Sequence, residues 1–149
     1  MIENQVSLAK EILQEHEELK AVIRQIERVL EEEESTQLSI QKLRSLRDEL
    51  VSFREHLQRH FELEEESGFL EKMAIDVPQA VEKVKRLQQE HGLILAAVDE
   101  SISADDAATA KFGELCCRIH RAIAAVKRHE EEEHLLIQTA YAQDLGAGD

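Results

Sequence analysis

The sequence predicts an all-α fold, an up-down-up-down bundle of four helices. The chain has 149 residues with a single proline and five glycines, so long helices meet few interruptions. Aromatic residues make up only 3% of the chain, whereas strands favour aromatic and β-branched residues. Apolar residues recur at alternating spacings of three and four in four long segments, as they do along the seam of a helical bundle.

The four segments are expected to form one domain over residues 1–149, with helices over about 7–33, 36–70, 77–102 and 107–143. The first helix has Ser7 near its start, a residue type that caps helix N-termini. The third follows Asp76 and carries Pro78 in its first turn. Short connections between such helices favour antiparallel neighbours.

Charge and composition exclude several classes of partner. The formal net charge of −14 argues against binding to nucleic acid and to anionic membrane surfaces, which both require basic residues. No apolar run is long enough to span a bilayer, and the first ten residues do not resemble a signal peptide. A cytoplasmic location is therefore expected, while the oligomeric state is unknown at this stage. The adjacent Cys116 and Cys117 are expected to be unpaired, partly buried residues.

Ionisable residues stand on the apolar stripe of every predicted helix. Each helix carries one histidine there: His16, His60, His91 and His129. The second and fourth helices add Glu64 and Glu133, each four residues after its histidine and therefore on the same face. In an up-down bundle the early part of the first helix lies at the same level as the late parts of the second and fourth. All six groups can therefore meet in one layer.

Such a layer is costly unless its polar atoms are satisfied, because a buried carboxylate without a partner is strongly unfavourable. Hydrogen bonds within the layer satisfy some atoms, whereas two divalent cations would satisfy all six groups. Imidazole suits iron, zinc, copper or manganese, and carboxylates bridge pairs of metals. Six donors are too many for one structural zinc ion, which takes four. The pattern therefore predicts a two-metal centre, with the histidines as terminal ligands and Glu64 and Glu133 as bridges.

His56 is an additional candidate ligand, one turn before His60 but at the flank of the stripe. It can complete the coordination, donate a hydrogen bond to a ligand or face solvent. His120, His134 and the glutamates beside the ligands are interpreted as surface residues: Glu65, Glu66, Glu130, Glu131 and Glu132. Gly92 has two interpretations, a close helix contact or a gap that admits a small ligand.

Four motifs, EHEEL, HFELEE, QEHGLI and HEEEEHLLI, resemble those of the hemerythrin-like (HHE cation-binding) family, and the resemblance covers essentially the whole chain. It implies a four-helix bundle with a non-haem di-iron centre, bridged by oxo or hydroxo and by carboxylates. It makes His16, His60, His91 and His129 terminal ligands and Glu64 and Glu133 bridges.

The chain departs from the oxygen-carrying animal hemerythrins at two points. The positions four residues from His91 hold Leu87 and Leu95, where those proteins have a fifth histidine on one side. Their last motif ends in an aspartate where this chain has His134. The sequence therefore resembles the broader bacterial-type group.

Three functions follow from the resemblance. The first is a di-iron protein that binds or senses O₂ or NO, with apolar residues around the centre keeping it dry: Leu19, Phe53, Leu57, Leu87 and Ile94. The second is an enzyme, a di-iron peroxidase or oxidase or a protein that repairs iron centres. The third is an iron-responsive regulatory module that acts by metal-coupled folding. The first is preferred because the sequence shows no redox-partner motif and no substrate machinery.

Overall fold

The computed structural model describes residues 2–31, 40–103, 112–142 and 145 of the chain. Its elements are α1 (Ile2–Glu31), α2 (Ile40–Ser67), α3 (Phe69–Asp76), the 3₁₀ turn η1 (Pro78–Ala80), α4 (Val81–Ser103) and α5 (Phe112–Tyr141). Within the described ranges every regular element is helical, which confirms the predicted all-α class.

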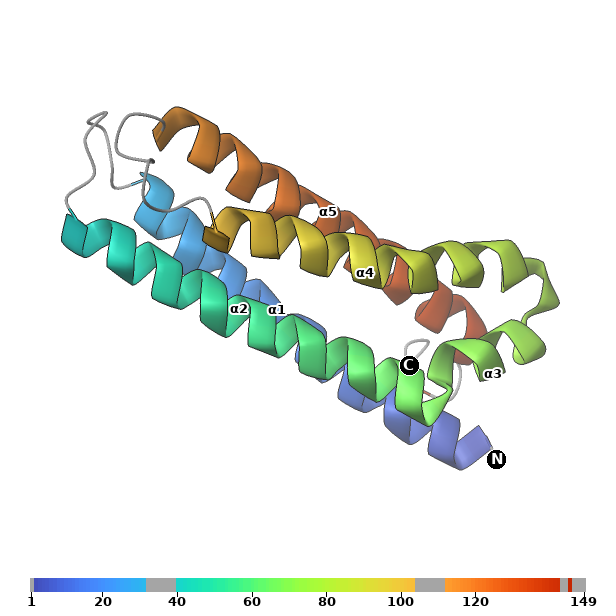
Figure 1. The fold of residues 1–149 in the computed structure, drawn as a ribbon. Coiled ribbons are helices and arrows are strands. Elements are labelled where there is room, and N and C mark those ends of the chain that lie inside the picture. Colours follow the sequence, from blue (N-terminus) through green and yellow to red (C-terminus); the bar gives the residue numbers. More distant parts are fainter. Residues whose placement is uncertain (1, 32–39, 104–111, 143–144, 146–149) are drawn as a thin grey trace.

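The four long helices form an up-down-up-down bundle, as predicted (Figure 1). The helix α1 packs against α2, α2 against α4, α4 against α5, and α5 against α1. The short helix α3 lies at the end of the bundle where α2 finishes and α4 starts (Figure 1). In the parts of the chain that are described, no helix combines the length and the apolar character needed to cross a membrane.

The observed helix bounds differ from the expected ones near α3. The expected second helix continues to about residue 70, but α2 ends at Ser67 because Gly68 has a φ of +67°. Glycine adopts this left-handed conformation without the steric cost that a Cβ brings. The expected third helix begins near residue 77, whereas η1 occupies that turn and α4 begins at Val81. The expected starts of the second and fourth helices lie outside the described residues.

The apolar core is divided into two clusters along the bundle axis. One, the main core cluster, includes Leu19, Leu57 and Ile94. The other, the α3 core cluster, includes Ile12, Leu87 and side chains of α3. His16 follows Ile12 by four residues and precedes Leu19 by three, and His91 lies between Leu87 and Ile94 in the same way. The ionisable side chains therefore form a layer between two apolar clusters.

Gly92 lies on the outer, exposed face of α4, and a Cβ there would meet nothing within 4 Å in the described chain apart from its chain neighbours and the adjacent backbone of α4. Both sequence interpretations of Gly92, a close helix contact and a gap beside the centre, are therefore wrong. The glycine is an unconstrained helical residue facing solvent.

We therefore predict that Gly92→Ala raises the free energy of unfolding by about 0.5–1 kcal/mol, the difference between glycine and alanine inside a helix. Urea denaturation monitored by circular dichroism measures it. The matched control is Gly68→Ala, which should lower stability because its φ is +67°. A loss of stability in Gly92→Ala would contradict the open environment of this residue.

Candidate metal centre

The six side chains predicted as ligands converge in the layer between the two core clusters. All are buried, with at most 3% of their surface exposed: His16, His60, Glu64, His91, His129 and Glu133. They come from all four long helices, because each occupies a position where the helical repeat would otherwise place an apolar residue. The structure thus brings together residues separated by up to 117 positions in the chain.

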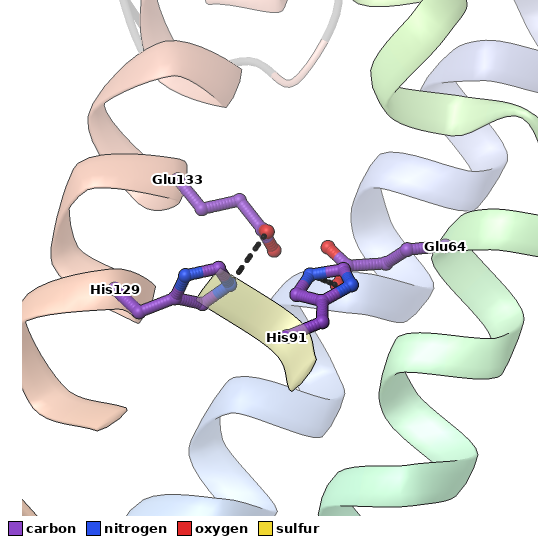
Figure 2. A group of neighbouring side chains, drawn as sticks. All are labelled: Glu64, His91, His129 and Glu133. Carbon is purple, nitrogen blue, oxygen red and sulfur yellow. Dashed lines mark ion pairs between the residues drawn. The ribbon is translucent and has the colours of Figure 1, made fainter. Parts of the chain in front are cut away.

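Their donor atoms form two overlapping groups. One contains Glu64, His91, His129 and Glu133, which point toward one another from α2, α4 and α5 (Figure 2). The other contains His16, His60 and Glu133. Within each group the donor atoms lie within 4.8 Å of one another. Because Glu133 belongs to both groups, its carboxylate lies where it can bridge two ions.

Glu64 also lies between the two groups. Its Oε1 is 3.4 Å from His91 Nε2 and 3.6 Å from His60 Nε2. These distances are long for hydrogen bonds. They match the spacing of two donors on one ion, since ligands about 2.1 Å from a metal are about 3–3.5 Å apart.

Several of the inward-facing atoms are orphaned. The Nε2 atoms of His60, His91 and His129, both oxygens of Glu64 and Oε2 of Glu133 are buried and have no hydrogen-bond partner among the residues that the structure describes. Buried polar atoms are normally satisfied, because each unsatisfied one costs about 1–3 kcal/mol. Metal ions placed between them would supply the missing partners. The donor set therefore fits a cation centre on its own chemistry.

The opposite nitrogen of three histidines is held by a carboxylate from the neighbouring helix. His60 Nδ1 donates to Glu15 at 2.6 Å, His91 Nδ1 to Glu65 at 3.0 Å, and His129 Nδ1 to Glu90 at 2.8 Å. Because an ionised carboxylate only accepts hydrogen bonds, the ring proton lies on Nδ1 and the lone pair of Nε2 points inward. This arrangement fixes the ring orientation and raises the basicity of a metal-binding imidazole.

Sequence reasoning missed these three carboxylates. Glu65 was interpreted as a solvent-facing residue, and its side chain is exposed although it holds His91. Glu15 and Glu90 each precede a predicted ligand histidine, but each binds the histidine of another helix. One signal was present: the tripeptide Gln-Glu-His occurs at 14–16 and again at 89–91. Its repetition marks the equivalent positions of α1 and α4.

An aromatic ring covers part of the centre. Phe61 stacks on His91 with ring centroids 4.0 Å apart and an angle of 8° between the planes. It also contacts the rings of His60 and His129, with centroids 5.8 Å and 5.6 Å away. Phe61 follows a predicted ligand directly and was not singled out from the sequence. Its ring limits rotation of His91 and keeps water from that side of the layer.

The two central carboxyl groups have opposite pKa shifts. Burial, together with the negative charge of Glu133, raises the pKa of Glu64 well above its usual value. Burial acts to raise the pKa of Glu133 too, but its interactions with Glu64 and with His16, whose Nε2 donates to Glu133 Oε1, outweigh burial and lower that pKa. When no cation is present, the proton therefore stays on Glu64 while Glu133 is ionised. A bound cation replaces that proton and allows both carboxylates to ionise.

Three other histidines lie outside both groups of donor atoms. His120 is exposed and His134 is partly buried. His56 is also partly buried; its Nδ1 is buried and lacks a hydrogen-bond partner within the described ranges. The geometry thus separates His56 from the six side chains that converge.

Glu130 differs from its sequence interpretation as a solvent-facing residue: it is only 4% exposed. It follows His129 on α5 and faces α1 rather than solvent, because the two helices pack together at this level. A hollow of about 490 Å³ lies there, lined by side chains of α1 and α5 that include His16 and Glu130. Burial raises the pKa of Glu130 from 4.5 to about 8.

The fold and the buried cluster together define a metal-binding helical domain. The family profile described as the Hemerythrin HHE cation binding domain matches residues 7–140, and the chain belongs to that family. Comparisons with curated proteins and with solved structures give no significant match. Membership agrees with the resemblance found in the four sequence motifs.

We predict a pH effect on the metal-free protein from Glu130. Its raised pKa means that the folded state holds a proton that the unfolded state releases, so this group contributes less stability as pH rises from 4.5 to about 8. Glu130→Gln cannot titrate and should therefore gain stability relative to the parent protein across that range. Urea unfolding of both apo-proteins at pH 5, 6, 7 and 8 measures the difference.

Glu64 titrates in both proteins, and because the negative charge of Glu130 also raises the pKa of Glu64, the measured difference includes this coupling. Glu131→Gln is the matched control, because Glu131 is the next residue and is exposed. Its free energy of unfolding should change with pH in the same way as that of the parent protein. A difference between Glu130→Gln and the parent that does not change with pH would contradict the buried state of Glu130.

Proposed function

We propose that this protein holds two iron ions in the buried layer and binds a small diatomic ligand, O₂ or NO, there. The observation that carries the proposal is the set of inward-facing orphaned donors, in which three imidazoles are oriented from behind by carboxylates. Four imidazoles and two carboxylates, with no thiolate, form a donor set that suits iron. The family supports a cation at this place.

The ligand roles follow from the two groups. His16 and His60 would hold one ion and His91 and His129 the other, with Glu133 and Glu64 between them. Iron, when bound, supplies the redox chemistry and the coordination position that a diatomic ligand needs. The chain supplies a rigid donor set and an apolar surround, since Leu57 and Leu87 are fully buried on either side of the layer.

A peroxidase is the second candidate, and one observation favours it. The hollow beside His16 has a largely apolar surface, but it also carries charged side chains, among them Lys20, Arg24 and Glu130. These charged groups can hydrogen-bond a polar oxygen compound, whereas an apolar gas makes no such bonds.

Metal content tests the ligand assignment. We predict that the parent protein takes up two iron ions per chain after anaerobic incubation with ferrous iron, and that Glu64→Ala and His129→Ala lose metal. Glu90→Ala should bind metal about 10–100-fold more weakly, as is usual when the carboxylate behind a metal-bound histidine is removed. Elemental analysis and competition with a chelator measure both quantities.

The control is His134→Ala, which removes an imidazole from the same helix but outside both donor groups. It should retain the full metal content. If Glu64→Ala kept two ions per chain, Glu64 would not be a bridge. If His134→Ala lost metal, the assignment of the α5 ligands would be wrong.

The ligand proposal is tested on the reduced, iron-loaded protein. We expect rapid mixing with NO or with O₂ to give a saturable change in the optical spectrum that reverses when the gas is removed, because a ligand that is bound without being converted can dissociate again. A protein that holds two ions but whose spectrum changes with neither gas would contradict the ligand proposal while leaving the metal centre intact.

A further inference from the structure

The hollow between α1 and α5 borders the metal centre directly. Its volume is about 490 Å³, and one of its lining residues is His16, which belongs to the His16, His60 and Glu133 group of donor atoms. On another side the centre is covered by Phe61, and above and below by the two core clusters. A molecule in the hollow is therefore next to a predicted ligand without displacing any part of the core.

Glu130 is the feature of this hollow that packing does not explain. Its side chain lines the hollow, is only 4% exposed, and its Oε1 has no hydrogen-bond partner in the described chain. Two of the cations that line the hollow pair with other carboxylates, Lys20 with Glu17 at 3.2 Å and Lys127 with Glu27 at 3.1 Å. A buried carboxyl group without a partner is unfavourable, and an apolar side chain would pack at lower cost.

The missing partner must be able to form hydrogen bonds in a space next to the centre. An ionised carboxylate requires a donor, and a protonated one offers a donor and accepts at its other oxygen. O₂ and NO have no hydrogen to donate. Hydrogen peroxide and small hydroperoxides both donate and accept, so they satisfy the carboxyl group in either ionisation state.

We propose that a small oxygen compound of the hydroperoxide class reaches the metal centre through the α1/α5 hollow and is held there by the carboxyl group of Glu130. This inference rests on the proposed iron centre and specifies a polar ligand for it. Glu130 acts as a binding residue that selects a hydrogen-bonding ligand over an apolar gas. Lys20 and Arg24 of α1 also line the hollow and add charged groups to its largely apolar surface.

The test compares two substitutions of the same residue. Glu130→Leu removes all hydrogen bonding, whereas Glu130→Gln keeps both a donor and an acceptor. The iron-loaded, reduced proteins are mixed with hydrogen peroxide and, separately, with NO, and the two rate constants are measured optically. Glu130→Leu should react with peroxide about tenfold more slowly, the effect of one lost hydrogen bond. Glu130→Gln should restore most of the rate, and the NO rate should be unchanged in both.

Glu131→Leu is the matched control, because it makes the same chemical change at the next residue, which lines the hollow but is exposed. It should leave both rates unchanged. The inference is overturned if Glu130→Leu reacts with peroxide at the parent rate. It is also overturned if the rate constants for peroxide and for NO fall by the same factor, which would indicate a general distortion of the metal centre. It is also overturned if Glu130→Leu loses iron, since Glu130 would then belong to the metal centre itself.

A second readout does not depend on turnover. In the zinc-substituted, redox-inert protein, infrared difference spectra with and without hydrogen peroxide should contain a carboxyl band that disappears in Glu130→Gln. The same band in both proteins would overturn the contact with Glu130. If the iron-loaded parent responds to neither NO nor O₂, the proposed function fails; if it responds to them but Glu130→Leu reacts with peroxide at the parent rate, only this inference fails.

Discussion

The rest of this structure depends on hydrogen bonds between histidine and glutamate that cross from helix to helix. Such a bond links each pair of long helices that are neighbours around the bundle: Glu15 to His60, Glu65 to His91, Glu90 to His129 and His16 to Glu133. Together they close a ring around the bundle at one level. The ring sets the relative height of the helices, because sliding any helix by one turn would break two bonds and bury unpaired groups.

This ring also satisfies one nitrogen of each of three histidines while it leaves their other nitrogen free. The Nδ1 atoms of His60, His91 and His129 bond to carboxylates that are partly exposed at the edge of the bundle. Water there partly solvates the carboxylates, which lowers the free-energy cost of their charge. The inward nitrogens of His60, His91 and His129, both oxygens of Glu64 and Oε2 of Glu133 are left without a partner in the described chain. Burial raises the pKa of Glu64, so the metal-free layer keeps a proton there that a cation would replace. Folding and cation binding would therefore be coupled at the same atoms.

Much of this could be predicted from sequence, because helical periodicity is a local property. His60 and Glu64 interrupt a regular apolar stripe, so their shared face and their burial follow from spacing alone. Glu15, Glu65 and Glu90 could not be assigned in this way, since their partners lie on other helices and depend on how the helices are rotated. The break at Gly68 was missed for a related reason: a single glycine is tolerated inside a helix unless tertiary contacts stabilise a turn.

Glu130 marks the limit of periodicity most clearly. It lies one residue beyond the stripe, where a helix that faced solvent would expose it, and only the packing of α1 against α5 buries it. A leucine at this position would satisfy the helical pattern and avoid an unpaired carboxyl group. Positions that violate a local rule without a structural gain are expected at functional sites, where stability is given up for chemistry. The ring of histidine–glutamate bonds does not include Glu130, so the bundle can tolerate its replacement, and its chemical role can be tested separately from the fold.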